Sequence, residues 1–193
     1  MRRISAARRS QVMGRSGAVA TSQPLAAQAG LQMLRQGGSA ADAAIAAAAT
    51  LNVVEPMNTG MGGDAFALVY DSDTREIAGL NASGRSPAAA TLEAFRRRGL
   101  DHVPARGMLP VTVPGAPAGW AALLERYGKL GLDTVLAPAI DYAREGFPVS
   151  ERISHNWQNS EDVLGRRAES ARVFLRDGKA PRPGELYRNP DLA

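Results

Sequence analysis

The sequence predicts an α+β fold in which helices and strands occupy separate stretches of the chain. Two observations favour it: an alanine-rich, helix-forming region over residues 24–51, and an apolar run followed by turn residues over residues 65–81. The chain has 193 residues, of which 45% are hydrophobic and 22% are charged, so it can bury a sizeable core. This composition argues against disordered, collagen-like and membrane-spanning proteins.

Two helices are expected in the first part of the chain. Pro24 lies near the start of the first and a Gly-Gly pair closes it, so we predict a helix over residues 24–36. Ser39 is typical of the cap of a second helix over residues 40–51, and Asp42 in its first turn suits the helix dipole. Small side chains surround this second helix, and we therefore expect it to be buried.

A β-hairpin is expected after the helices. Residues 65–70 form a short, nearly all-apolar run, which is typical of a strand covered on both faces. Turn-forming residues at 71–74 allow residues 75–81 to return as the partner strand. The predicted order is therefore helix, helix, strand, strand.

The second half of the chain predicts further helices and one small hairpin. The expected helices lie over residues 91–99, 116–127 and 133–146, and a fourth begins after Ser150. Residues 172–179 predict a small exposed hairpin. Residues 189–193 resemble the opening of a helix that does not continue, so we expect the chain to be a piece of a longer protein.

The net charge of +4 is concentrated near the N-terminus. Five of the 23 Lys and Arg residues lie in the first 16 positions, and residues 17–193 hold 18 basic and 19 acidic residues. We therefore divide the chain into a basic tail, residues 1–16, and a body, residues 17–193, and expect no nucleic-acid partner. No apolar segment follows the arginines, so we expect no signal peptide, no membrane partner and a cytoplasmic location, with the periplasm or secretion as the alternative.

Few residues are suited to metal or nucleophilic chemistry. Cysteine is absent, which excludes disulfides, thiolate zinc sites and a Cys nucleophile. The two histidines, His102 and His155, have no acid and hydroxyl around them at a recognisable spacing. Trp120 and Trp157 are interpreted as anchors of the core or of an interface. We expect no metal and no organic cofactor.

The segment Gly60-Met61-Gly62-Gly63-Asp64-Ala65 matches the pattern G-x-G-x-x-G/A of dinucleotide-binding proteins. That pattern requires a strand before it and a helix after it, because the pyrophosphate lies at the helix N-terminus. Here a helix precedes the glycines and a strand follows them, and Asp64 would lie beside the phosphates. We therefore interpret the glycines as providing positive φ angles and close backbone contact at the start of a strand.

Arg85 is the side chain best placed to bind a substrate. It lies in the segment Asn81-Ala82-Ser83-Gly84-Arg85-Ser86-Pro87, between the predicted hairpin and a helix. A guanidinium group can bind a carboxylate through two parallel hydrogen bonds. From the residues alone, a structural ion pair or a solvated side chain is the alternative.

Five blocks of sequence, in order, resemble the N-terminal part of the large subunit of γ-glutamyltranspeptidases. The resemblance covers roughly Arg9 to the C-terminus. The blocks are residues 17–26, 37–46, 55–66, 113–128 and 137–147. Five ordered blocks are far more specific than one glycine motif.

The resemblance implies an N-terminal-nucleophile hydrolase with an αββα sandwich, made as a precursor that cleaves itself into a large and a small subunit. In that family the N-terminal Thr of the small subunit attacks a γ-glutamyl amide, with its own α-amine as base, and passes the acyl group to water or an amine. We therefore expect no catalytic residue in this chain. Its expected partner is the remainder of the precursor, including the small subunit.

The sequence departs from the familiar transpeptidases at the substrate-binding arginine. In those proteins an arginine that grips the substrate α-carboxylate lies four residues before the proline matching Pro87, where this sequence has Ser83. Here Arg85 lies two residues before that proline, a pattern more similar to the cephalosporin-acylase subgroup. Two residues of extended chain span about 6–7 Å, so the clamp needs a different backbone path. The substrate-binding candidates are Arg85 and Ser83.

Three functions are therefore open. The first is a part of a self-processing amidohydrolase and acyltransferase that cleaves γ-glutamyl amides such as glutathione. The second is an N-acyl amide acylase of the cephalosporin type with the same fold. The third is a non-catalytic interaction module, in which the alanine-rich helices and the Trp120 face bind a partner.

Overall fold

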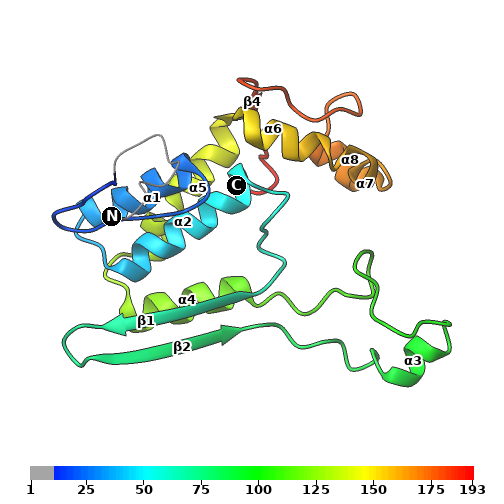
Figure 1. Cartoon of the computed structure of the whole chain (residues 1–193), viewed down its shortest axis with the longest axis horizontal. Coiled ribbons are helices and arrows are strands. Elements are labelled where there is room, and N and C mark those ends of the chain that lie inside the picture. The colour runs from blue at the N-terminus through cyan, green and yellow to red at the C-terminus, as the bar shows by residue number, and fades with distance from the viewer. Residues whose placement is uncertain (1–10) are drawn as a thin grey trace, which may run out of the picture.

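The computed structural model describes residues 11–193, and it is mixed helix and strand as predicted (Figure 1). The predicted basic tail, residues 1–16, lies largely outside the described residues, and residues 11–16 form no helix or strand. In chain order the elements are α1 (Pro24–Arg35), α2 (Ala40–Val54), β1 (Ala65–Asp71), β2 (Glu76–Ala82), α3 (Leu92–Arg96), α4 (Ala116–Tyr127), α5 (Leu132–Glu145), β3 (Phe147–Pro148), α6 (Glu151–Gln158), α7 (Glu161–Leu164), α8 (Ala168–Phe174) and β4 (Leu186–Tyr187).

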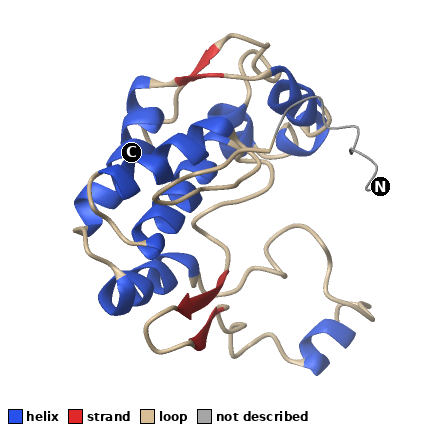
Figure 2. Cartoon of the chain, turned by 60° about the vertical axis from the view of Figure 1, so that its left-hand side comes forward, coloured by secondary structure: helices blue, strands red, loops and turns tan. Residues whose placement is uncertain are grey.

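The elements form a helical layer above a β-hairpin. Helix α2 packs against α1 and α5, and α4 lies between α2 and the hairpin formed by β1 and β2 (Figure 1). Figure 2 shows the same division from another side, with the hairpin and α3 apart from most of the helices. No helix among the described residues is long and apolar enough to cross a membrane.

Helix α2 begins at the predicted cap and runs three residues further than predicted. The Ser39 hydroxyl accepts the Asp42 N–H at 3.2 Å, and the Asp42 carboxylate accepts the Ser39 N–H at 2.6 Å, which completes a capping box. The helix continues beyond residue 51 because Val53 and Val54 are buried in the core. Most of its residues are buried, as its small side chains predict.

Asp42 also joins α2 to the segment that follows α4. Its fully buried carboxylate accepts the backbone N–H groups of Lys129 and Leu130 at 3.0–3.3 Å. Burial opposes ionisation, but the hydrogen bonds from Ser39, Lys129 and Leu130 outweigh it and lower the pKa of Asp42 below its ordinary 3.8. One ionised side chain therefore fixes the start of α2 and the path from α4 to α5.

The β1–β2 hairpin is covered on one face only. Strand β1 pairs antiparallel with β2, from Ala65 opposite Ala82 to Asp71 opposite Glu76. The inward face packs on α4, where Gly119 allows a close approach to Ala82. The outward face carries large apolar side chains that are 62–82% exposed, namely Phe66, Leu68, Tyr70 and Ile77.

The prediction that residues 65–70 are covered on both faces is therefore wrong for the described chain. The apolar run is not a sign of two-sided cover, because its inward positions carry small or half-buried side chains and its outward positions carry the large ones. We call Phe66, Leu68, Tyr70 and Ile77 the outer hairpin face.

The helices of the second half lie close to their predicted positions, but the C-terminal hairpin differs. Residues 168–174 form α8, so the predicted strand before the turn is helical. Only the turn itself is a hairpin: Asp177 and Gly178 have φ of 49° and 75°, and Arg176 pairs with Lys179. The turn residues predicted this turn correctly, whereas packing of Phe174 against Trp157 favours a helix before it.

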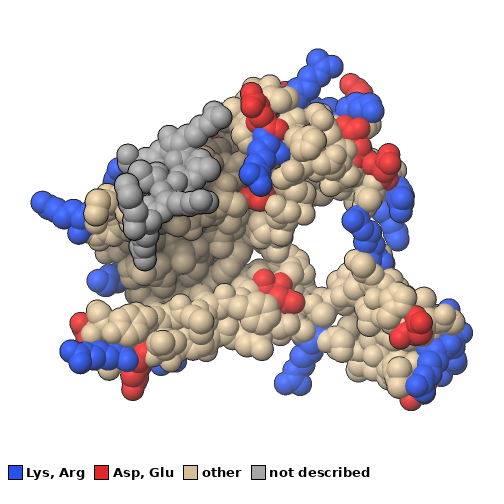
Figure 3. Space-filling view, in the orientation of Figure 1, with Lys and Arg blue, Asp and Glu red and all other residues tan. Residues whose placement is uncertain are grey.

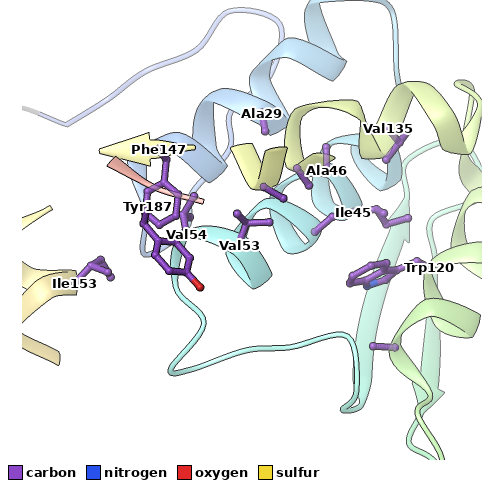
Figure 4. Packing of buried hydrophobic residues seen from close by; sticks show 14 of the residues in the cluster. Ala29, Ile45, Ala46, Val53, Val54, Trp120, Val135, Phe147, Ile153 and Tyr187 are labelled. Carbon is purple, nitrogen blue, oxygen red and sulfur yellow. The ribbon is translucent and has the colours of Figure 1, made fainter. Parts of the chain in front are cut away.

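A second part of the core surrounds Trp157, which is 1% exposed. Tyr187 stacks edge-on against Trp157 and Phe147, with ring centroids 4.7 Å and 5.9 Å apart. Figure 4 shows Phe147 and Tyr187 beside Val54 of α2. Burial raises the pKa of the Tyr187 hydroxyl to about 12, and this hydroxyl donates to the Val173 carbonyl at 2.9 Å. These contacts join the short β3–β4 pair, which sequence did not predict, to α6 and α8.

Replacing Asp42 with Ala should lower the free energy of unfolding by about 2–3 kcal/mol, because three backbone N–H groups lose a charged acceptor. Urea unfolding at pH 7 measures this loss. The matched control is Asp133→Ala, which removes an exposed acid from the first turn of α5 and should cost less than about 0.5 kcal/mol. Equal losses in the two variants would contradict the bracing role of Asp42.

The stability that Asp42 provides should depend on pH. A lowered pKa means that its contribution is complete above about pH 3.8 and is lost as the pH falls below that value. The difference in unfolding free energy between the wild type and Asp42→Asn should therefore shrink from pH 5 to pH 2. A constant difference over this range, measured by urea unfolding, would be inconsistent with the lowered pKa.

Candidate substrate-binding site

Ser83 and Arg85 lie together in the loop that follows β2, at the end of the hairpin. Both residues are exposed. The Ser83 N–H donates to the Asn81 side-chain oxygen at 2.9 Å. Within residues 11–193 no carboxylate lies within ion-pair distance of Arg85. The alternative of a structural ion pair is therefore not met in the described chain, whereas the exposed guanidinium matches the other alternative, a solvated side chain, and its role in substrate binding stays a prediction.

The backbone around Arg85 is held by hydrogen bonds from two other segments. The Asp64 carboxylate, directly before β1, accepts the Gly84 N–H at 2.8 Å. The Arg85 carbonyl accepts the Val113 N–H at 3.0 Å. The Gly63 carbonyl accepts the N–H groups of Gly115 and Ala116 at 3.1 and 3.0 Å.

Two glycines permit this contact between the segments. A Cβ atom at Gly84 would lie 1.5 Å from the Val113 carbonyl oxygen, and one at Gly115 would lie 2.0 Å from the Ala82 carbonyl oxygen. Real Cβ atoms do not approach backbone so closely, so only glycine fits at either position. We call residues 63–64, 82–85 and 113–116 together the Arg85 brace.

The glycine turn before β1 does not behave as the sequence predicts. Gly60, Gly62 and Gly63 do not have positive φ angles, and a Cβ atom at Gly60 or Gly62 would meet nothing within 4 Å. The interpretation as a turn needing positive φ and close contact is therefore wrong for these glycines within the described chain. The close contacts occur instead at Gly84 and Gly115, whose spacing along the sequence gives no local signal.

Side-chain hydrogen bonds hold the start of this glycine turn. The buried Glu55, at the end of α2, accepts the Ser22 hydroxyl at 2.5 Å and the Asn58 amide at 2.6 Å. The Thr59 hydroxyl donates to the Asn52 side-chain oxygen at 2.7 Å. This network fixes the chain from α2 to β1 and therefore the position from which Asp64 reaches Gly84.

A cavity of about 310 Å³ lies beside the network, between α2, β1 and α4. It is lined mostly by apolar side chains, including Ile45 and Trp120, and by Asn52, Thr59 and Asp64. The Nδ2 group of Asn52 is buried without a hydrogen-bond partner among the described residues. The cavity lies at the same end of the hairpin as the Arg85 brace.

The remaining candidate residues do not join this site. His102 is exposed in the loop after α3, where its only ion pair among the described residues is with its neighbour Asp101. His155 lies on the exposed face of α6. Trp120 and Trp157 are buried, which confirms their interpretation as core anchors. No group of three or more acids or histidines among the described residues is arranged to hold a metal ion.

Figure 3 shows an opening between the part of the molecule that carries α6–α8 and the part that carries α3. Basic and acidic side chains are interspersed over this face.

A smaller cavity of about 230 Å³ places Arg106, from the loop after α3, against Trp157 and Phe174. Neither Arg106 nor Asp64 was predicted as a site residue, because each meets its contacts across long sequence separations.

Comparison with known proteins places the chain in a family. The sequence profile described as "Gamma-glutamyltranspeptidase" matches residues 26–193. The chain belongs to the γ-glutamyltranspeptidase family. It is 41% identical over 183 residues to the "Glutathione hydrolase-like YwrD proenzyme" of Bacillus subtilis, an alignment that covers 94% of this chain and 34% of that relative. The chain therefore spans about a third of the length of this curated relative.

Two solved structures share the fold. A cephalosporin acylase from Bacillus halodurans has a TM-score of 0.83 at 43% identity, over 95% of this chain and 36% of that one. The γ-glutamyltranspeptidase of Helicobacter pylori has a TM-score of 0.88 at 29% identity, over 95% and 53% of the two chains. These matches confirm the predicted family and the N-terminal-nucleophile hydrolase fold. This chain is the N-terminal portion of a γ-glutamyltranspeptidase family member.

Replacing Gly84 with Ala should lower the free energy of unfolding by about 2–4 kcal/mol, because the new methyl group cannot share space with the Val113 carbonyl. The matched control is Gly62→Ala, where the methyl group would meet nothing within 4 Å. Thermal and urea unfolding of the two variants measure the difference. A Gly84→Ala variant as stable as Gly62→Ala would rule out the close contact in the Arg85 brace.

Proposed function

We propose that this chain is part of a self-processing amidohydrolase and acyltransferase that cleaves γ-glutamyl amides such as glutathione and passes the acyl group to water or an amine. The observation that carries the proposal is Arg85, an exposed guanidinium without an ion-pair partner in the described chain, held on a braced loop. A relative at 41% identity is named a glutathione hydrolase-like proenzyme, which supports this substrate class.

Arg85 would bind the α-carboxylate of the γ-glutamyl group. The guanidinium presents two parallel N–H groups to two carboxylate oxygens, which fixes both the position and the orientation of the acyl group. Ser83, two residues earlier on the same exposed loop, offers a hydroxyl that can donate to or accept from the same ligand. Because the loop backbone is braced, the arginine is oriented before the substrate arrives.

The attacking hydroxyl would come from the remainder of the precursor. In the proposed reaction the N-terminal Thr of a small subunit attacks the amide carbon and its α-amine takes the hydroxyl proton. The α-ammonium then passes this proton to the amide nitrogen, and the C–N bond breaks to release the amine of the substrate. Water or an acceptor amine then attacks the acyl-enzyme and restores the free Thr. This chain supplies scaffold and the carboxylate clamp, and no residue of it is assigned a catalytic role.

The remainder of the precursor would also cover the outer hairpin face. Phe66, Leu68, Tyr70 and Ile77 form an apolar surface on a strand pair that is open to water in the described chain. An αββα sandwich needs a second sheet against this surface. The proposed partner of this chain is therefore the rest of the same polypeptide, including the small subunit.

The second candidate function is an N-acyl amide acylase. It is favoured by the 43% identity to a cephalosporin acylase and by the arginine that lies two residues, instead of four, before Pro87. A glutaryl amide, which keeps the terminal carboxylate of a γ-glutamyl amide but lacks its α-amino group, separates the two substrates. A non-catalytic module is not retained, because members of this family are enzymes.

In the complete precursor, Arg85→Ala should raise KM for γ-glutamyl-p-nitroanilide about tenfold or more and leave self-cleavage unchanged, because the carboxylate loses a paired donor. Arg85→Lys, which keeps the positive charge but not the planar pair of N–H donors, should have a KM between those of the wild type and Arg85→Ala. Steady-state kinetics and the appearance of the small subunit on a gel measure these effects. An unchanged KM would remove Arg85 from the binding site, and equal turnover of the glutaryl amide by the wild type would favour the acylase.

Leu68→Asp in the complete precursor should reduce assembly of the two subunits several-fold, because a charge on the outer hairpin face must be desolvated against its partner surface. The control Thr74→Asp places the same charge in the exposed turn between the strands and should leave assembly unchanged. Size-exclusion chromatography of the processed protein measures the assembled fraction. Equal assembly of the two variants would mean that the outer hairpin face is not covered.

A further inference from the structure

Asp64 is the residue of the Arg85 brace whose side chain makes a hydrogen bond to the loop of Arg85. Asp64 lies directly before β1 and Gly84 lies just after β2, so the two residues are neighbours across the open end of the hairpin. The Asp64 Oδ1 atom accepts the Gly84 N–H at 2.8 Å, although the residues are twenty positions apart in the sequence. We infer that Asp64 is a positioning residue that sets the direction of the Arg85 side chain through the backbone.

Two hydrogen bonds bracket Arg85. The bond from the Gly84 N–H to Asp64 fixes the chain before the Arg85 Cα atom, and the bond from the Val113 N–H to the Arg85 carbonyl fixes it afterwards. With both in place, the backbone of Gly84 and Arg85 is restrained on either side. Without Asp64, Gly84 keeps its contact with the Val113 backbone, but it loses the bond to its N–H and has no Cβ atom of its own to restrict its dihedrals.

Ladder pairing does not replace the Asp64 bond. The β1–β2 ladder ends at Ala65 opposite Ala82, so residues 83–85 are beyond its last pair. The hydrogen bond to Asp64 fixes the chain at Gly84, two residues beyond the last ladder pair and directly before Arg85. Its carboxylate is exposed, so the bond costs little desolvation and its effect falls on the loop rather than on the core.

The inference rests on the proposed role of Arg85 as a carboxylate clamp. A guanidinium that binds two carboxylate oxygens at once depends on its orientation within a few tenths of an ångström, so a freer loop weakens substrate binding. Self-cleavage and the chemical step do not involve Arg85 in the proposed mechanism. Loss of Asp64 should therefore raise KM and leave kcat within about twofold.

The test uses the complete, self-cleaved precursor and whichever of γ-glutamyl-p-nitroanilide and glutaryl-p-nitroanilide it turns over. Asp64→Ala removes the acceptor and should raise KM about five- to tenfold. Asp64→Asn keeps an oxygen that can accept the Gly84 N–H, so it should restore KM to within about twofold of the wild type. The matched control is Asp71→Ala at the other end of β1, where Oδ1 accepts the Asp73 N–H at the same 2.8 Å; its KM should not change.

The double variant Asp64→Ala with Arg85→Ala separates this inference from the proposed function. If Asp64 acts through Arg85, the double variant has the KM of Arg85→Ala alone. The positioning role of Asp64 is overturned if Arg85→Ala raises KM but Asp64→Ala does not. It is also overturned if the two increases in KM multiply in the double variant; in both cases the role of Arg85 as a carboxylate clamp is retained. If Arg85→Ala leaves KM unchanged, the proposed clamp itself falls.

Hydrogen–deuterium exchange covers the case in which Asp64→Ala fails to self-cleave. In the uncleaved precursor, the peptide that contains residues 83–87 should exchange about five- to tenfold faster in Asp64→Ala than in the wild type, and Asp64→Asn should match the wild type. The peptide over residues 71–74 serves as the internal control and should not change. Equal exchange at residues 83–87 in all three proteins would overturn the inference.

Discussion

The buried carboxylate of Asp42 is the interaction on which the arrangement of the described elements depends. It caps α2 and at the same time holds the segment after α4, so it joins the helical layer to the helix that supports the hairpin. Helix α4 in turn carries the hairpin, and the hairpin carries the loop of Arg85. The position of a substrate-binding candidate is therefore set by an ion more than forty residues earlier in the chain.

The local signals predicted the helices well because their causes are local. Pro24 at a helix start, Ser39 at a cap and the apolar spacing in α4 act within one or two turns, and each element lies where these residues predict it. The end of α2 and the conformation of residues 168–174 depend instead on burial of Val53, Val54 and Phe174. Such burial comes from packing partners that are remote in sequence.

The role of Ser83 and Arg85 in substrate binding stays a prediction, and the contacts that hold their loop could not be predicted from the sequence. The resemblance identified Ser83 and Arg85, and the structure places both on one exposed loop. The brace could not be predicted, since Asp64 to Gly84 and Gly63 to Gly115 are long-range contacts without a spacing rule. The glycines of residues 60–63 match a known sequence motif, but none of them is required by a close contact. Glycine is required instead at Gly84 and Gly115, where a Cβ atom would collide with a backbone carbonyl and which belong to no motif.

The one-sided cover of the hairpin has a consequence for synthesis of the protein. As the N-terminal portion of a larger enzyme this part is translated first, and at about 5–20 residues per second a ribosome needs tens of seconds for a chain as long as the YwrD relative, of which the alignment covers 34%. During that interval Phe66, Leu68, Tyr70 and Ile77 face solvent on a strand pair to which no other strand of residues 11–193 is paired. An apolar strand pair in this state is prone to pair with the strands of other chains, before any enzyme exists.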